Sequence, residues 1–136
     1  MPGKLNFLLQ IAKSRIHGNG AYAFKSIPAK TKIGSMAGEI ISKKLAREKA
    51  KENESISIVE LWNGKALDAS IIYNNLKFIN HSCCPNTYMR TLQNHVEFYT
   101  LRFIKTSEEL TCNYGPTHHD GKRKCKCGAP NCKGFI

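Results

Sequence analysis

Apolar and polar residues alternate over short stretches along most of the chain, which is the pattern of half-buried β-strands. The clearest stretch is VEFYTLRFI, which alternates and is rich in β-branched and aromatic side chains. Gly, Pro, Asn and Ser separate the stretches and mark turns. The pattern predicts a mainly β fold, with strands at residues 5–12, 21–24, 32–41, 56–62 and 95–104.

One segment has helical character instead. SKKLAREKAKEN begins with Ser42, a residue type that caps helix N-termini, and only Leu45, Ala46 and Ala50 are available for packing. We therefore predict one exposed helix after Ser42.

The size of the chain limits it to one compact domain with a modest core, because 41% of its 136 residues are apolar. No apolar run reaches the roughly 18 residues of a membrane span. The opening segment MPGKLNFLLQIAKSR has too short an apolar run for a cleaved secretory signal. We expect an intracellular protein with no membrane partner, and six cysteines that serve as reduced thiols for metal binding more than as disulfides.

The formal charge of +11 arises from 21 Lys and Arg against 10 Asp and Glu. Such a balance favours polyanionic neighbours, so the basic surface predicts contact with chromatin or nucleic acid. Much of the charge lies in residues 43–51 and 122–133, where a solvated face is an equally good interpretation.

Three cysteines near the C-terminus, Cys125, Cys127 and Cys132, have C-x-C-x4-C spacing with glycine and proline between them. This spacing brings three thiolates around one point, whereas a closed structural zinc site has four ligands. From spacing alone the fourth ligand stays open, as does the alternative of three free thiols. The candidates for the fourth ligand are Cys83, Cys84, Cys112, His118 and His119.

Two further segments concentrate polar chemistry. In FINHSCCPN, residues 78–86, an apolar strand end runs into Asn80, which suits a ligand's polar group, and His81, which suits a base or a ligand. In EELTCNYG, residues 108–115, Tyr114 ends a short extended run. Read alone, Tyr114 is a packed aromatic residue and a lone histidine is structural.

Together and in this order, the three segments resemble the SET-domain family. FINHSCCPN resembles the motif R-F-x-N-H-S-C-x-P-N, EELTCNYG resembles E-L-T-x-D-Y-G, and the C-terminal cysteines resemble the post-SET pattern. Upstream, HGNGAYAFKSIPAKTKIGSMAGEII is similar to the family's G-x-G motif, I-P-x-x-x turn and G-E-I-I strand. The resemblance covers residues 15–136.

The resemblance implies a SET-domain fold of short curved sheets with a pseudoknot, in which the N-H-S segment passes beneath the loop of the E-L-T-x-x-Y segment. It implies a SET domain at residues 1–116 and a post-SET zinc-binding segment at residues 117–136, within one compact unit. The family's fourth thiolate comes from the N-H-S-C cysteine. The implied zinc ligands are therefore Cys83, Cys125, Cys127 and Cys132.

The resemblance also implies a protein-lysine N-methyltransferase that uses S-adenosylmethionine and acts on a histone tail or another lysine-containing protein. Tyr114 is the implied catalytic residue, and it lines the lysine channel with Phe78 and Cys112. The implied cofactor-binding residues are Gly18, Asn19, Gly20, Lys77, Asn80, His81 and Phe135.

Four positions depart from the family pattern. Asn113 replaces an aspartate, Met36 a second active-site tyrosine, Lys77 an arginine and Tyr73 a common glycine. Because none of these removes Tyr114, Asn80 or His81, the enzyme interpretation holds.

Cys112 occupies the variable position of E-L-T-x-x-Y, where a tyrosine tends to limit the family's product to one methyl and a phenylalanine tends to permit two or three. Cysteine is smaller than both and a weak hydrogen-bond donor. A di- or trimethyl product is therefore predicted, unless a neighbour such as Phe78 or Tyr88 fills the space.

The alternative function is a non-catalytic SET-like zinc module that binds peptide or nucleic acid, and binding of S-adenosylmethionine distinguishes the two. The expected location is the nucleus for a eukaryotic protein, and the cytoplasm or the host cell for a bacterial or viral one. The substrate lysine and the oligomeric state stay open.

Overall fold

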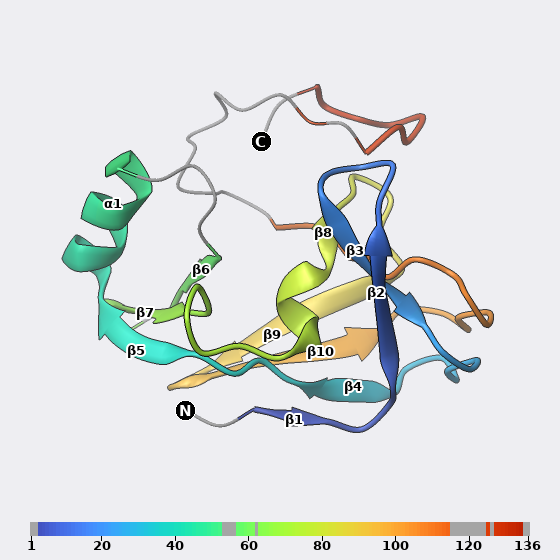
Figure 1. The fold of residues 1–136 in the computed structure, drawn as a ribbon, viewed down its shortest axis with the longest axis horizontal. Coiled ribbons are helices and arrows are strands. Elements are labelled where there is room, and N and C mark those ends of the chain that lie inside the picture. The colour runs from blue at the N-terminus through green and yellow to red at the C-terminus, as the bar shows by residue number, and fades with distance from the viewer. Residues whose placement is uncertain (1–2, 53–56, 62, 115–124, 126, 135–136) are drawn as a thin grey trace.

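The computed structural model describes residues 3–52, 57–61, 63–114, 125 and 127–134. Short β-strands dominate this part of the chain and form three separate sheets (Figure 1). The predicted mainly β class is therefore confirmed.

The largest sheet is mixed, and its edge carries the site discussed below. β9 and β10 form an antiparallel hairpin, whereas β11 pairs in parallel with both β9 and β8. The strand order is β1 (Lys4–Leu5), β4 (Lys32–Ser35), β10 (His95–Thr100), β9 (Thr87–Leu92), β11 (Thr111–Cys112) and β8 (Asn80–His81).

Two smaller sheets complete the fold, and Figure 1 places them on opposite sides of the large one. The first is an antiparallel hairpin of β2 (Leu9–Lys13) and β3 (Asn19–Ala23). The second has the strand order β5 (Glu39–Ser42), β7 (Lys65–Asp68) and β6 (Ile58–Glu60), with helix α1 (Lys43–Glu52) beside it. A 3₁₀ helix, η1 (Asn75–Phe78), leads directly into β8.

Two predicted strands are each divided in the structure. Residues 5–12 contain the end of β1 and most of β2, and residues 32–41 contain β4 and most of β5. A Cβ at Gly38 would lie 2.8 Å from the carbonyl oxygen of Asp68, so the backbone approaches β7 too closely there for a side chain. The strand predicted at 95–104 ends at Thr100, and Ile104 forms an isolated bridge with Ile27.

Other boundaries differ less. The strand predicted at 21–24 is β3, which starts two residues earlier, and β6 lies within the predicted 56–62, whose two ends are outside the described residues. β7 and β9 were not predicted. In β9 the residues facing solvent include Tyr88 and Leu92, so apolar and polar residues do not alternate cleanly along it.

The predicted helix is confirmed as α1. The Ser42 Oγ accepts a hydrogen bond from the Leu45 N–H at 3.1 Å, as an N-cap should. Ala46 is buried, whereas Leu45 is 40% exposed and does not serve the expected packing role. Cations of the helix pair with carboxylates: Lys43 and Arg47 with Glu60, and Lys49 with Asp68. Much of its charge therefore belongs to a paired, solvated face.

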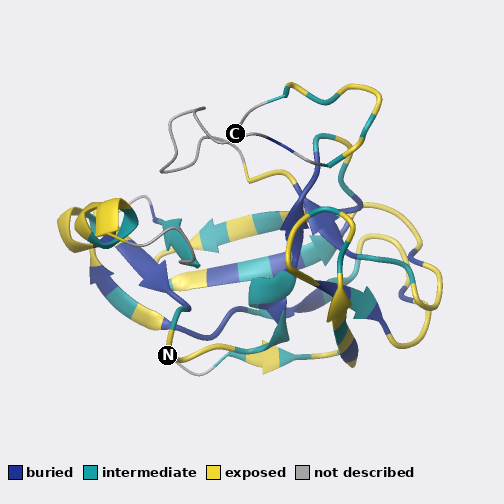
Figure 2. Ribbon diagram, turned by 45° about the horizontal axis from the view of Figure 1, so that its top comes forward, coloured by how far each residue is buried: buried dark blue, intermediate teal, exposed yellow. Residues whose placement is uncertain are grey.

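The core lies between the large sheet, the β2–β3 hairpin and the elements around η1 (Figure 2). Its largest fully buried side chains include Phe98, Ile27, Ile33, Leu76 and Leu110. Leu76 lies in η1, which leads into β8, and Leu110 directly precedes β11, so the core fixes the backbone of these two strands. Among the described residues, α1 and η1 are too short and polar to cross a membrane.

Candidate active site and cysteine cluster

Parallel pairing of β8 with β11 brings two chemically distinctive segments together. Asn80 lies opposite Thr111, and His81 lies opposite Cys112. The pairing continues beyond the strands, because the Ser82 N–H donates to the Cys112 carbonyl at 3.0 Å. Tyr114 follows β11 by two residues and so reaches His81. The structure thus brings Asn80, His81 and Tyr114 to one place, as the family resemblance implied.

The Asn86 amide fixes β11 in this position. Asn86 is buried; its Nδ2 donates to the Glu109 carbonyl at 2.8 Å, and its Oδ1 accepts from the Thr111 N–H at 2.8 Å. The Thr87 hydroxyl donates to the Thr111 carbonyl at 2.7 Å. The side chains of Asn86 and Thr87, where β9 begins, therefore satisfy the Glu109 carbonyl and the N–H and carbonyl of Thr111.

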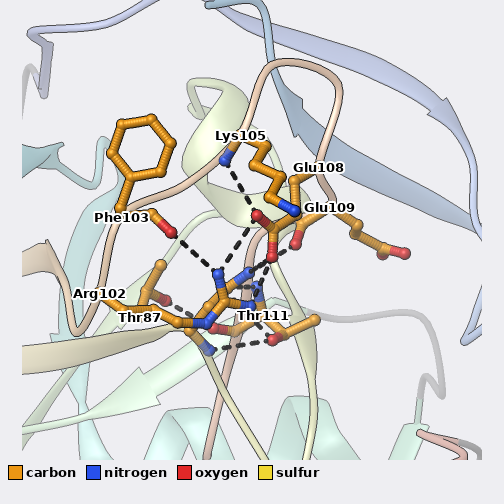
Figure 3. Close-up of polar contacts among 8 residues, drawn as sticks. Thr87, Arg102, Phe103, Lys105, Glu108, Glu109 and Thr111 are labelled. Atoms are coloured by element: carbon orange, nitrogen blue, oxygen red, sulfur yellow. Dashed lines mark hydrogen bonds and ion pairs between the residues drawn. The ribbon is translucent and has the colours of Figure 1, made fainter. Parts of the chain in front are cut away.

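A cluster of charged side chains lies next to Asn86, at the segment that leads into β11. The Glu108 carboxylate accepts hydrogen bonds from Arg102 Nη2 at 2.5 Å, from the Lys105 N–H at 2.9 Å and from Asn86 Nδ2 at 3.3 Å. The Arg102 hydrogen bond is the main reason that the pKa of Glu108 lies below its usual range. Figure 3 shows Arg102, Lys105 and Glu108 converging, while the Glu109 side chain points away from them.

Glu109 instead faces the loop between β2 and β3. Its Oε2 accepts from the Ser14 hydroxyl at 2.7 Å, and a Cβ at Gly20 would lie within 2.4 Å of the same oxygen. Gly18 has a φ of +45°, a conformation that favours glycine. Gly18 is therefore needed for backbone geometry and Gly20 for space beside the Glu109 carboxylate.

Asn80 joins this loop to β8. Its Nδ2 donates to the carbonyl oxygens of His17 at 3.0 Å and Asn19 at 3.2 Å, and lies 3.3 Å from Glu109 Oε2. Its Oδ1 has no hydrogen-bond partner within the described residues, although Asn80 is only 8% exposed. Buried amide oxygens are normally paired, so this atom marks a place for a ligand's N–H donor.

His81 and Tyr114 touch through both backbone and rings. The buried His81 accepts the Tyr114 N–H at its Nδ1, 3.0 Å away, and the ring centroids are 5.3 Å apart. The Tyr114 hydroxyl donates to the Ile79 carbonyl at 2.6 Å, while 37% of the residue is exposed. Burial, and then the charge of Lys133, lower the pKa of His81.

Lys77 and Tyr73, two residues that depart from the family pattern, are in contact. Lys77 Nζ lies 3.7 Å from the centroid of the Tyr73 ring, and Tyr73 meets the Phe78 ring edge to face at 6.0 Å between centroids. Burial lowers the pKa of Lys77. The Tyr73 ring therefore binds the Lys77 ammonium by a cation–π contact, which a glycine at position 73 could not make.

Cys112 and Met36 are both buried, and both belong to the core. Cys112 has no exposed surface, and burial raises the pKa of its thiol far above its usual range. Phe78, also expected in the channel, is half-buried. Among the three residues expected to line the channel, Tyr114 is the most exposed.

The four cysteines that the resemblance implied lie together. The sulfur atoms of Cys83, Cys125, Cys127 and Cys132 are all within 4.8 Å of one another. In tetrahedral coordination with Zn–S of about 2.3 Å, the sulfurs would be about 3.8 Å apart, so the cluster fits the ion with little contraction. Cys84 is exposed and Cys112 is in the core, and neither belongs to the cluster.

Backbone N–H groups favour the thiolate form of Cys127 in this cluster. Burial alone would raise the pKa of Cys127, but N–H groups of Cys83 and Ala129 and the neighbouring thiols lower it to about 6. Burial raises the pKa of Cys125 to about 12. The Asn131 amide donates to the Cys83 carbonyl at 3.0 Å and ties the tail to the end of β8.

Several expected residues lie outside the described part of the chain: Phe135, His118, His119 and the boundary at 116/117. Conversely, Asn86, Glu108 and Glu109 were assigned no role from the sequence. Asn86 is the last residue of the first motif, Glu109 is the first residue of the second and Glu108 precedes it, so membership of the motifs was the signal available.

A family model of the SET domain matches residues 18–115. The chain is 36% identical, over 95% of its length, to the histone-lysine N-methyltransferase set-2 of Caenorhabditis elegans. It is 34% identical over 94% to SETD1B of Xenopus tropicalis, and 32% identical over 93% to trithorax of Drosophila virilis, both also named histone-lysine N-methyltransferases.

The chain spans only 9%, 7% and 4% of the lengths of these three relatives, respectively. The family model nevertheless covers most of the chain, and the motif residues converge in space. The chain belongs to the SET-domain family.

Proposed function

We propose that this chain is an S-adenosylmethionine-dependent protein-lysine N-methyltransferase with a structural zinc site. The observation that carries the proposal is the convergence of Asn80, His81 and Tyr114 through the β8–β11 pairing. A zinc module without catalysis would need the cysteines but not this convergence.

The chain offers a suitable place for the cofactor's methionine end. The loop of Gly18, Asn19 and Gly20 places the Asn19 carbonyl beside the Asn80 amide, whose Oδ1 has no hydrogen-bond partner among the described residues. Oxygen acceptors of this kind suit an ammonium group. We assign these residues and the main chain of His81 to cofactor binding. Lys77 and Phe135 complete the proposed set from the family resemblance.

When bound, the cofactor supplies a methyl group on a positively charged sulfonium. The chain's own task is to align a neutral lysine amine with that methyl and to exclude water. A free lysine with a pKa of about 10.4 is rarely neutral near pH 8, and desolvation lowers its pKa. Tyr114 is the proposed orienting residue, because its ring is accessible and its hydroxyl and backbone are both fixed.

The zinc ion would have a structural role. With Cys83 at the end of β8 and the other ligands in the tail, a bound ion would hold residues 125–134 against the site. This supports the proposed division into a SET domain, 1–116, and a post-SET segment, 117–136.

Histones are the proposed substrate class, since the relatives named above are histone-lysine methyltransferases. The proposed location is the nucleus for a eukaryotic protein, with chromatin contact through the basic surface, and the cytoplasm or the host cell for a bacterial or viral one. The degree of methylation proposed is di- or trimethyl. Exhaustive methylation of a preferred peptide, read by mass spectrometry, tests it; a wild-type product that stops at monomethyl would contradict the role of Cys112.

Two measurements test the activity itself. Calorimetry on the zinc-loaded protein should detect binding of S-adenosylmethionine, and core histones incubated with labelled cofactor should gain label. Tyr114→Phe should still bind cofactor but lose most turnover, since its hydroxyl serves the transition state more than the fold. Absence of cofactor binding by the wild type would overturn the enzyme proposal in favour of a binding module.

A further inference from the structure

Both ring nitrogens of His81 are engaged, and they face different parts of the molecule. Nδ1 lies 3.0 Å from the backbone nitrogen of Tyr114, and Nε2 lies 3.5 Å from the Sγ of Cys83. The residue is only 6% exposed, so water does not compete freely for either atom. One imidazole therefore spans the distance between the cysteine cluster and the proposed catalytic tyrosine.

The direction of the two contacts follows from chemistry. A backbone N–H can only donate, so Nδ1 must be the unprotonated acceptor. The ring proton then resides on Nε2 and points toward the Cys83 sulfur, which as a zinc-bound thiolate would be an acceptor. This tautomer also leaves His81 without a free nitrogen to act as a base or as a metal ligand.

Other sulfurs of the cluster accept N–H donors as well. The Cys83 N–H lies 3.5 Å from Cys127 Sγ, and the Gly134 N–H lies 3.4 Å from Cys132 Sγ. These two donors are backbone groups that stay near the cluster. His81 differs because its other nitrogen holds Tyr114, so it links the cluster to the site.

We propose that His81 is a positioning residue whose Nε2–H binds the zinc-bound thiolate of Cys83 while its Nδ1 fixes the backbone of Tyr114. The inference rests on the proposed zinc site and extends it: the metal holds not only the tail but also, through one side chain, the tyrosine. Groups hydrogen-bonded to metal ligands commonly change metal affinity by roughly 10- to 100-fold.

Two substitutions separate the two hydrogen bonds. In His81→Asn the amide oxygen takes the position of Nδ1 and can accept from Tyr114, but nothing reaches Cys83. In His81→Gln the amide nitrogen takes the position of Nε2 and can donate to Cys83, but the Tyr114 N–H loses its acceptor. The main chain of residue 81 is unchanged in both.

The decisive experiment uses the full chain with ¹¹³Cd in place of zinc and ¹⁵N in the protein. Long-range ¹H–¹⁵N spectra should show His81 protonated at Nε2 only, and the Hε2 proton should couple to ¹¹³Cd through the Cys83 sulfur. An Nδ1–H tautomer, or cadmium held by four cysteines without this coupling, would overturn the proposed role of His81 and leave the proposed metal site intact. Failure of the wild type to bind cadmium or zinc would overturn both.

The variants give a second readout. His81→Asn should release zinc to a competing chelator roughly tenfold more readily, while keeping the Tyr114 amide resonance near its wild-type position. His81→Gln should show the opposite: nearly normal zinc retention and a displaced Tyr114 resonance. Equal effects of the two variants on both measurements would mean that His81 only fills space. The wild-type spectra decide the question even if a variant fails to fold.

Discussion

Removal of the Asn86 amide should destabilise the protein more than removal of a half-buried amide that makes a single hydrogen bond. Asn86→Ala leaves the buried Thr111 N–H and the part-buried Glu109 carbonyl without their Asn86 partner, each held at 2.8 Å in the wild type. An unsatisfied buried group costs about 1–3 kcal/mol, so two give at most about 2–6 kcal/mol. Relaxation of the short β11 brings the expected loss to about 2–4 kcal/mol.

Urea unfolding followed by circular dichroism measures this loss. The matched control is Asn75→Ala, which removes one half-buried hydrogen bond, to the Leu9 carbonyl at 3.0 Å, and should cost about 0.5–1.5 kcal/mol. Asn86→Asp should not rescue stability, because it loses the donor and places a second carboxylate beside Glu108. If Asn86→Ala were no less stable than Asn75→Ala, the amide would not hold β11.

Three further outcomes are expected. Cys83→Ser should lose zinc and cofactor affinity while the neighbouring Cys84→Ser keeps both, as elemental analysis and calorimetry can measure; full zinc content in the Cys83 variant would remove that residue from the ligand set. A double-mutant cycle of Tyr73→Leu and Lys77→Met should give a coupling of about 0.5–1 kcal/mol in unfolding free energy, and strict additivity would refute the cation–π contact. Burial raises the pKa of Asp68, but hydrogen bonds from Lys49 and Ser70 outweigh it and leave the pKa below its ordinary value. Its contribution to stability is therefore complete above the unfolded pKa of about 3.9 and is lost as pH falls through the lower folded value. Asp68→Asn should flatten the unfolding free energy between pH 5 and pH 2, measured by urea titration, and an unchanged slope would contradict the assignment.

The family resemblance predicted which distinctive residues lie together. Cys83 joins the C-terminal cysteines as the resemblance implied, and Asn80, His81 and Tyr114 meet. These predictions depend on side chains whose chemistry is rare in ordinary loops. The functional role of each residue at the site stays a prediction until the variants are measured.

The sequence was less informative where backbone groups are the partners. Asn86 accepts the Thr111 N–H, whereas Glu109 accepts the Ser14 hydroxyl and occupies the space beside Gly20. No local sequence pattern predicts these contacts. The division of the strand predicted at 32–41 also depends on distant segments, because β4 pairs with β10 in one sheet and β5 pairs with β7 in another. Tertiary contacts, not local propensity, decided these features.

The hydrogen bond between Ser14 and Glu109 joins residues 95 positions apart, and that between Asn80 and His17 spans 63. Contacts of such long range close large loops, and the entropy of loop closure makes them late events in folding. We expect the β9–β10 hairpin to form early and the junction of β8, β11 and the glycine loop to form last. A chain still emerging from the ribosome would lack β11 and hence this junction, so competence to bind a ligand would report that synthesis had passed Cys112.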